Sequence, residues 1–263
     1  MCPLPSDLYD RDYFLSDKCE GWDRFRESRG LSAIKERQVR ALGPAPGLRV
    51  LDAGCGRGEV LLACARAGAE VAGLDYAQAA VELTTETLAG VPAADIRRGD
   101  VTRLPWEDAS FDRILFADVI EHVDPALTVK ALSELRRVLR PGGLLLVHTA
   151  PNKLFVKVGW PLCRPAMRLM GRGAAADALD RWLGEAEAYH VNEQSVHGLR
   201  RALRKAGFRR PAVWIDPDVL RGGGHFLTKG LDGGVMALAG RLAGTRPVRL
   251  LLGNDLYALA RAP

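Results

Sequence analysis

Short apolar runs alternate with amphipathic stretches along this chain from residue 48 onward. The apolar runs have the length of buried strands, and they occur at residues 48–54, 70–75, 94–100, 111–118, 144–150, 212–216 and 255–261. Stretches with helical periodicity that end at glycine or proline predict helices at residues 31–42, 59–67, 77–90, 125–140, 192–205 and 235–242. This alternation predicts right-handed βαβ units and a mostly parallel sheet with helices on both faces, which is an α/β fold.

The length of 263 residues suits one large α/β domain. Residues 1–47, the N-terminal cap, are mixed polar and aromatic, and they precede a predicted cofactor-binding core at residues 48–150. Residues 151–190 are not required by the strand–helix alternation, so they are predicted to form a lid-like insertion. Residues 191–263 then complete the sheet.

Composition narrows the class of protein. Hydrophobic residues make up 48% of the chain and charged residues 26%, which is ordinary for a globular protein. The five cysteines form no C-x-x-C pair, which argues against a zinc site or a disulfide framework and favours the cytoplasm. The N-terminus lacks the pattern of a signal peptide, and we find no apolar stretch of about 18 residues that would predict a membrane-spanning helix. A net charge of +5 is too mild to indicate nucleic-acid binding.

Glycines and acids mark the ends of four predicted strands. The first strand runs into Gly54-Cys55-Gly56-Arg57-Gly58, where glycines permit unusual backbone angles and the close approach of a ligand. The next three strands end in Asp75, in Asp100-Val101 and in Ala117-Asp118. Ligands of parallel α/β sheets bind beyond the carboxyl ends of the strands, so these residues are predicted to surround one nucleoside-sized pocket. Asp75 is suited to accept hydrogen bonds from ribose hydroxyls, and Asp100 with Val101 to bind the edge of an adenine.

The charges beside this turn distinguish two kinds of nucleoside cofactor. A dinucleotide requires the spacing G-x-G-x-x-G, so that its pyrophosphate meets a helix N-terminus. This chain has Glu59 where the third glycine would stand, and we expect its carboxylate to repel a pyrophosphate. Asp52, before the glycines, would instead attract a sulfonium or an α-amino group. The turn therefore favours S-adenosyl-L-methionine; a nicotinamide oxidoreductase and a protein that binds the nucleoside without turnover stay open as alternatives.

The ordered motifs of residues 48–150 resemble those of class I S-adenosylmethionine-dependent methyltransferases, similar to the type 11 small-molecule enzymes. VLDAGCGRGEV is similar to the first motif of that family, GLDYA to the second, GDVTRLPWEDASFDRI to the third, and ADVIEHV with LRPGGLLLV to the fourth and fifth. The resemblance implies a Rossmann-like fold with a seven-stranded sheet whose last strand is antiparallel, and a small-molecule methyl acceptor. It also implies that Tyr76 packs on the adenine. The pocket and the resemblance together predict these cofactor-binding residues: Asp52, Gly54, Cys55, Gly56, Asp75, Tyr76, Asp100, Val101 and Ala117.

Methyl transfer from a sulfonium is an in-line displacement that depends mainly on alignment of the reactants and removal of water, so the sequence need not contain an obvious catalytic residue. Some hydroxyl or amine acceptors also need a general base. The candidates are Asp118, Glu121 and His122, which follow the fourth strand, and His190, at the end of the insertion. We predict no metal site, because ligands from a single D-x-x-E-H turn make a poor geometric set.

The segment from Lys153 to Arg172 contains five basic residues and no acid, with Phe155, Trp160 and several aliphatic residues between them. A basic amphipathic segment of this kind is typical of peptides that lie in a lipid interface, which predicts a peripheral membrane contact or an apolar acceptor. An ordinary lid packed on the core is the alternative. We expect no nucleic-acid substrate, because basic residues are not interleaved with stacking aromatic residues.

Overall fold

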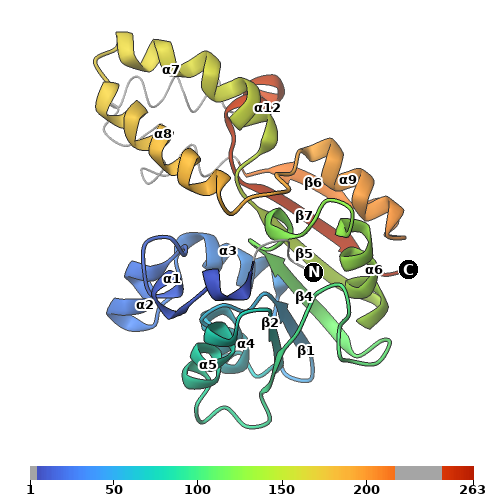
Figure 1. Ribbon diagram of the computed structural model, residues 1–263. Coiled ribbons are helices and arrows are strands. Elements are labelled where there is room, and N and C mark those ends of the chain that lie inside the picture. The colour runs from blue at the N-terminus through green and yellow to red at the C-terminus, as the bar shows by residue number, and fades with distance from the viewer. Residues whose placement is uncertain (1–4, 217–244) are drawn as a thin grey trace.

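The computed structural model describes residues 5–216 and 245–263, and the helix expected at residues 235–242 lies outside them. A seven-stranded sheet runs through the centre of the molecule in the order β3-β2-β1-β4-β5-β7-β6 (Figure 1). Its strands are β1 (Arg49–Ala53), β2 (Glu70–Asp75), β3 (Asp95–Arg98), β4 (Phe111–Ala117), β5 (Leu139–Thr149), β6 (Ala212–Ile215) and β7 (Leu256–Arg261). Strand β7 pairs antiparallel with both β5 and β6, whereas β1 to β5 pair in parallel. The expected α/β sheet with an antiparallel last strand is confirmed.

Helices cover both faces of this sheet because successive side chains of a buried strand point to opposite faces. Leu145 of β5 belongs to a buried cluster with Leu135 of α6 (Thr128–Val138). Its neighbour Leu146 belongs to a second cluster with Leu61 of α4 (Glu59–Arg66). The remaining helices of these layers are α3 (Ala33–Leu42), α5 (Gln78–Thr87) and α9 (Val196–Lys205).

Two predicted boundaries were wrong. The helix expected at residues 125–140 ends at Val138, and β5 begins at Leu139, which pairs with Phe111 across an irregularity in the ladder. The Pro-Gly-Gly sequence therefore lies within the bounds of β5, at an irregularity where Gly142 has a φ of 75°, instead of in the expected helix–strand loop. The helix expected from residue 192 begins at Val196, because the Ser195 side chain caps it by accepting a hydrogen bond from the Gly198 N–H at 3.1 Å.

The N-terminal cap and the insertion lie at the edge of the sheet formed by the carboxyl ends of the parallel strands (Figure 1). The cap contains η1 (Ser6–Leu8), α1 (Arg11–Phe14) and α2 (Trp22–Ser28) before α3. The insertion is a helical hairpin of η3 (Phe155–Gly159), α7 (Trp160–Leu169) and α8 (Gly173–Glu187), and α12 (Arg246–Leu252) packs against η3. No helix in the described part of the chain has the length and apolar character needed to span a bilayer.

Candidate functional site

The glycine turn between β1 and α4 has the backbone that the sequence predicted. Gly54 has a φ of 101°, and a Cβ placed on it would overlap Cγ2 of Val119. Gly58, with a φ of 79°, precedes α4, and a Cβ there would lie 2.9 Å from Cγ2 of Thr84 on α5. The turn is therefore closed to side chains at both positions, and Gly58 is needed for helix packing.

A cavity of about 750 Å³ lies beyond this turn. It is lined by all nine residues that we predict to bind the cofactor: Asp52, Gly54, Cys55, Gly56, Asp75, Tyr76, Asp100, Val101 and Ala117. They lie at or just beyond the carboxyl ends of four adjacent strands, so the sheet order brings together segments that lie far apart in the sequence. Their roles in cofactor binding stay predictions.

The carboxylate of Asp75, at the end of β2, is held in place by backbone hydrogen bonds. Its carboxylate accepts hydrogen bonds from the backbone N–H groups of Gly56 and Ala77, both at 3.0 Å. Burial nevertheless raises the pKa of Asp75 above its ordinary value. An ionised carboxylate has about four lone-pair sites, so oxygen positions remain for two hydroxyl donors.

Glu59 does not have the role that the sequence suggested. Its Oε1 atom lies 2.5 Å from Nζ of Lys35 and 2.7 Å from Nη2 of Arg57. Burial opposes ionisation, but these two cations hold the pKa of Glu59 below its ordinary value. Their charges neutralise Glu59, so its carboxylate is not free to repel a pyrophosphate, and that part of the reasoning was wrong. Arg57 also donates to the carbonyl of Phe14 at 2.7 Å, so this buried cluster fastens the cap to the glycine turn.

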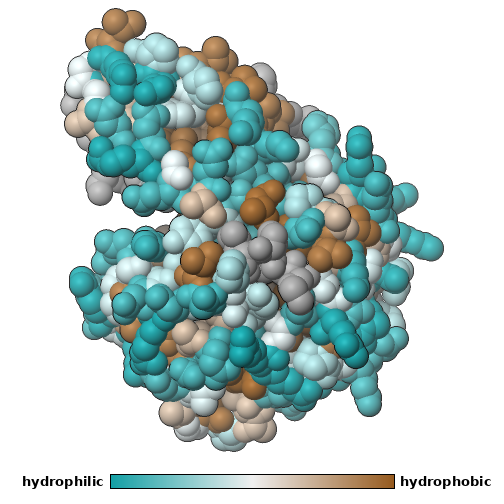
Figure 2. Space-filling model, in the orientation of Figure 1, coloured by the Kyte–Doolittle hydropathy of each residue, from teal (hydrophilic) through white to brown (hydrophobic). Residues whose placement is uncertain are grey.

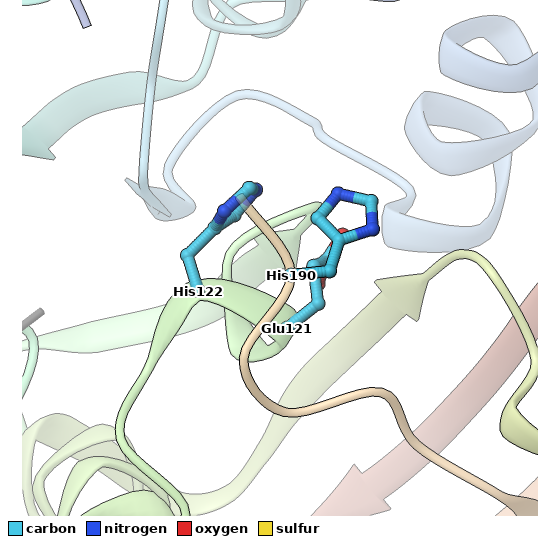
Figure 3. Close-up of side chains that lie close together, drawn as sticks. All are labelled: Glu121, His122 and His190. Carbon is cyan, nitrogen blue, oxygen red and sulfur yellow. The ribbon is translucent and has the colours of Figure 1, made fainter. Parts of the chain in front are cut away.

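Three of the four catalytic candidates lie close together (Figure 3). Glu121 and His122 lie on η2 (Ile120–His122), and His190 lies after α8. Glu121, His122 and His190 offer ligand atoms that all lie within 4.8 Å of one another, so they could hold one metal ion. The Nδ1 atom of His122 already lies 2.9 Å from the carbonyl oxygen of Tyr189 and 3.0 Å from the Tyr9 hydroxyl. All three residues line the cavity.

Burial changes the protonation of this cluster. Burial, with Asp118 nearby, raises the pKa of Glu121 to about 8, and the Thr149 hydroxyl donates to its Oε2 at 2.9 Å. Burial also lowers the pKa of His122. Burial, together with the neighbouring His122, lowers the pKa of His190 to about 4. Near neutral pH the cluster therefore contains a largely protonated carboxyl group and two neutral imidazoles.

Asp118, the fourth candidate, faces a different partner. Its Oδ1 atom lies 2.8 Å from Nδ1 of His148, and Nε2 of His148 lies 3.3 Å from Oδ1 of Asp255. Sequence reasoning missed His148 and Asp255. One signal was the histidine near the end of an otherwise apolar strand. A second was the antiparallel last strand, because its first residues must lie at the same edge as the ends of the other strands.

The insertion differs from the expected apolar surface. Phe155, Trp160 and Met167 are buried in a cluster with Leu179 of α8, so they stabilise the hairpin itself. The exposed large apolar residues of the insertion are Val158, Leu162, Leu169 and Met170. Figure 2 shows hydrophobic surface at the outer end of this hairpin, and an indentation between the hairpin and the N-terminal helices.

Comparison with known proteins decides the family. The family model described as "Methyltransferase domain" matches residues 51–147. The chain is 31% identical over 241 residues to a demethylmenaquinone methyltransferase of Beutenbergia cavernae. The aligned region covers 89% of this chain and 91% of that protein. This chain belongs to the class I S-adenosylmethionine-dependent methyltransferases of type 11. Its cofactor is S-adenosylmethionine, and it is an enzyme.

Two further proteins are similar to this chain. A ubiquinone biosynthesis O-methyltransferase of Paracidovorax citrulli is 36% identical over 135 residues, or 49% of this chain and 56% of that protein. A solved structure of geranyl diphosphate methyltransferase in complex with SAM has 20% identity and a TM-score of 0.61, and the alignment covers 97% of this chain and 95% of that one. At that identity the solved structure supports the fold alone. The Paracidovorax protein is matched over less than two thirds of its length.

Proposed function

We propose that this methyltransferase transfers the methyl group of S-adenosylmethionine to a small, apolar, lipid-like acceptor that carries a ring hydroxyl or carbonyl group. The observation that carries the proposal is the extent of the cavity. It continues from the predicted cofactor residues past Asp118 to His148 and Asp255, at the ends of strands that no cofactor residue occupies. Tyr9, Tyr13 and Ile34 line it from the cap, and Trp182 lines it from the insertion.

In the proposed reaction the cofactor and the protein have different roles. S-adenosylmethionine supplies a methyl group that is already activated on a sulfonium. We propose that Gly54, Gly56 and Asp52 hold the methionine part of the cofactor, and that Asp75 binds the ribose. Tyr76, Asp100 and Val101 would then hold the adenine. This leaves alignment of the acceptor and exclusion of water to the cap and the lid-like insertion.

Glu121 is the general base that we propose for an acceptor with a hydroxyl group. Glu121 is 1% exposed, and it lines the cavity. The pKa of its carboxyl group is about 8, and a general base is most effective when its pKa lies near the working pH of the enzyme. The hydrogen bond from Thr149 fixes one of its oxygens. His190, with a pKa of about 4, is the weaker base of the cluster.

The names of the relatives support the same class of acceptor. They are methyltransferases named for demethylmenaquinone and for ubiquinone biosynthesis. We propose that the exposed face of α7 brings the enzyme to a lipid surface where such acceptors reside. Leu162 and Leu169 are 67% and 90% exposed on nearly the same side of the helix. Arg164 and Arg168 are paired with Asp180 and Asp177 of α8, whereas Lys157 is exposed just before α7.

A transfer assay tests the proposed function. The protein is incubated with methyl-tritiated S-adenosylmethionine and either a short-chain demethylmenaquinol, a prenylated phenol, or a set of water-soluble amines and carboxylic acids. We expect label in the organic extract with a hydroxylated lipid-like acceptor, and less of it with the Asp75→Asn variant. Labelling of only the water-soluble acceptors would contradict the proposal.

A further inference from the structure

The half of the cavity that lies beyond Asp118 has a polar wall of its own. Strand β7 is antiparallel, and its first residue, Leu256, pairs with Thr149 of β5 and with Ile215 of β6. The residues just before β7 therefore lie beside the end of β5. Asn254, Asp255 and His148 line the cavity there, and Arg37 and Gln38 line it from α3. None of these five residues belongs to the predicted cofactor site.

Most of this wall is internally paired. His148 lies between Asp118 and Asp255, and Nε of Arg37 lies 3.1 Å from Oδ2 of Asp216. Burial opposes protonation of His148, but the adjacent carboxylates outweigh it and raise the pKa of His148 well above its ordinary value. In these pairs three carboxylates face two cations, so an anionic ligand would meet a surplus of negative charge.

Two side chains of this wall are not paired. Within residues 5–216 and 245–263, the Nε2 atom of Gln38 and the Oδ1 atom of Asn254 are buried without a hydrogen-bond partner. Gln38 is 1% exposed and Asn254 is 9% exposed. A buried polar group without a partner destabilises a protein by about 1–3 kcal/mol, and native proteins keep few of them. An amide N–H donor and an amide oxygen acceptor on the wall of one cavity suit a ligand that can both accept and donate.

We propose that Gln38 and Asn254 bind a neutral hydroxyl group, or a neighbouring hydroxyl and carbonyl group, of the methyl acceptor. This inference rests on the proposed function, because it assumes that the acceptor occupies this half of the cavity. A hydroxyl oxygen accepts from the Gln38 amide, and its proton is donated to the Asn254 oxygen. The two residues select neutral oxygenated rings over carboxylates and phosphates.

Binding of three naphthalene probes to the protein saturated with S-adenosylhomocysteine tests the proposal. The probes are 1,4-dihydroxynaphthalene under reducing conditions, its dimethyl ether and 1-naphthoate. The dihydroxy probe should bind about tenfold more tightly than the ether, which corresponds to about 1.4 kcal/mol, and the naphthoate should bind most weakly. Gln38→Leu and Asn254→Leu should each remove this preference and leave S-adenosylhomocysteine binding unchanged. The control Gln78→Leu makes the same chemical change on the exposed face of α5 and should preserve it.

The thermal stability of the ligand-free variant gives a second readout. Replacing an unpaired buried amide with an apolar side chain of similar shape should raise the Tm of Gln38→Leu by about 2–4 °C, whereas a structural role would lower it. Equal binding of the diol and the ether, tighter binding of the naphthoate, or a lowered Tm would overturn the inference alone. If the holoprotein binds S-adenosylhomocysteine but none of the three probes, both the inference and the apolar acceptor of the proposed function are wrong.

Discussion

The imidazole of His148 lies 2.8 Å from the carboxylate of Asp118, and the pair joins the ends of β5 and β4 in the wall of the cavity. Asp118 has a φ of 55°, in the left-handed region that a residue other than glycine seldom adopts. His148 is buried, and Asp255 lies on its other side. This ion pair therefore contributes to the stability of the fold and places two opposite charges in the wall of the cavity.

The first prediction concerns pH and stability. A histidine whose pKa is raised on folding stabilises the protein fully below its unfolded pKa of about 6.5, and this stabilisation is lost as the pH rises through the folded value. His148→Gln should lower the free energy of unfolding at pH 6 by about 3 kcal/mol, the low end for a broken buried pair because the Asp118 side chain is 37% exposed. The difference from the wild type should shrink as the pH rises. Urea denaturation over a pH series measures it.

His197→Gln is the control for that prediction, because His197 is an exposed histidine on α9. It should leave the pH dependence of the wild type intact. Parallel pH curves for the wild type and His148→Gln would contradict a stabilising ion pair.

The second prediction concerns the cofactor. Asp75→Asn removes the charge from the predicted ribose acceptor, and a hydrogen bond to a charged group contributes about 1.5–3 kcal/mol. The Kd for S-adenosylhomocysteine should therefore rise roughly 10- to 100-fold, as measured by isothermal titration calorimetry. Glu70→Gln, an exposed acid at the opposite end of the same strand, should bind like the wild type. Unchanged binding by Asp75→Asn would place the ribose elsewhere.

The third prediction concerns the proposed general base. Because only ionised Glu121 can take a proton, kcat should rise with pH through about 8 and then level off. Glu121→Gln should reduce kcat by about 10²- to 10⁴-fold and abolish that rise. Glu187→Gln, an exposed acid on α8, serves as the control. A pH–rate profile that keeps its shape in Glu121→Gln would assign proton transfer to another group.

The fourth prediction concerns the lipid surface. Leu162→Ser with Leu169→Ser removes exposed apolar area without changing the charge, and should weaken co-sedimentation with vesicles containing anionic lipid by at least about tenfold. Ala174→Ser introduces the same hydroxyl at an exposed position of α8, without removing a large apolar side chain, and should bind like the wild type. If the leucine variant sediments as well as the wild type, α7 does not contact the membrane. Phe155 and Trp160 are unsuitable for this test because they are buried inside the hairpin.

The fifth prediction concerns metal ions. Activity should be unchanged by EDTA, because the methyl group is already activated on a sulfonium and Nδ1 of His122 already contacts Tyr189 and Tyr9. A methyl-transfer assay with and without the chelator measures this. Loss of activity that a divalent cation restores would instead assign an ion to Glu121, His122 and His190.

The sequence of this chain determined the local features of the site. The apolar runs and helical periods predicted the sheet, because alternation of strand and helix is a property of neighbouring residues. The glycines of the turn and the acids Asp75 and Asp100 could be identified for the same reason, since each lies at or directly after the end of a predicted strand. The predicted repulsion by Glu59 failed because two cations neutralise it. Arg57 is a neighbour in the sequence, but Lys35 lies 24 residues away, on a helix whose position relative to the turn is not a local property.

Only the tertiary structure decided which distant residues meet. Strand order places Asp118, His148 and Asp255 side by side, although they lie just after β4, on β5 and just before β7. Packing likewise decided that Phe155 and Trp160 are buried while Leu162 and Leu169 are exposed, although all four look alike in a sequence pattern. The physical reason is that burial and ion pairing depend on distances between elements, and those distances are set by the crossover connections and the antiparallel last strand rather than by local sequence.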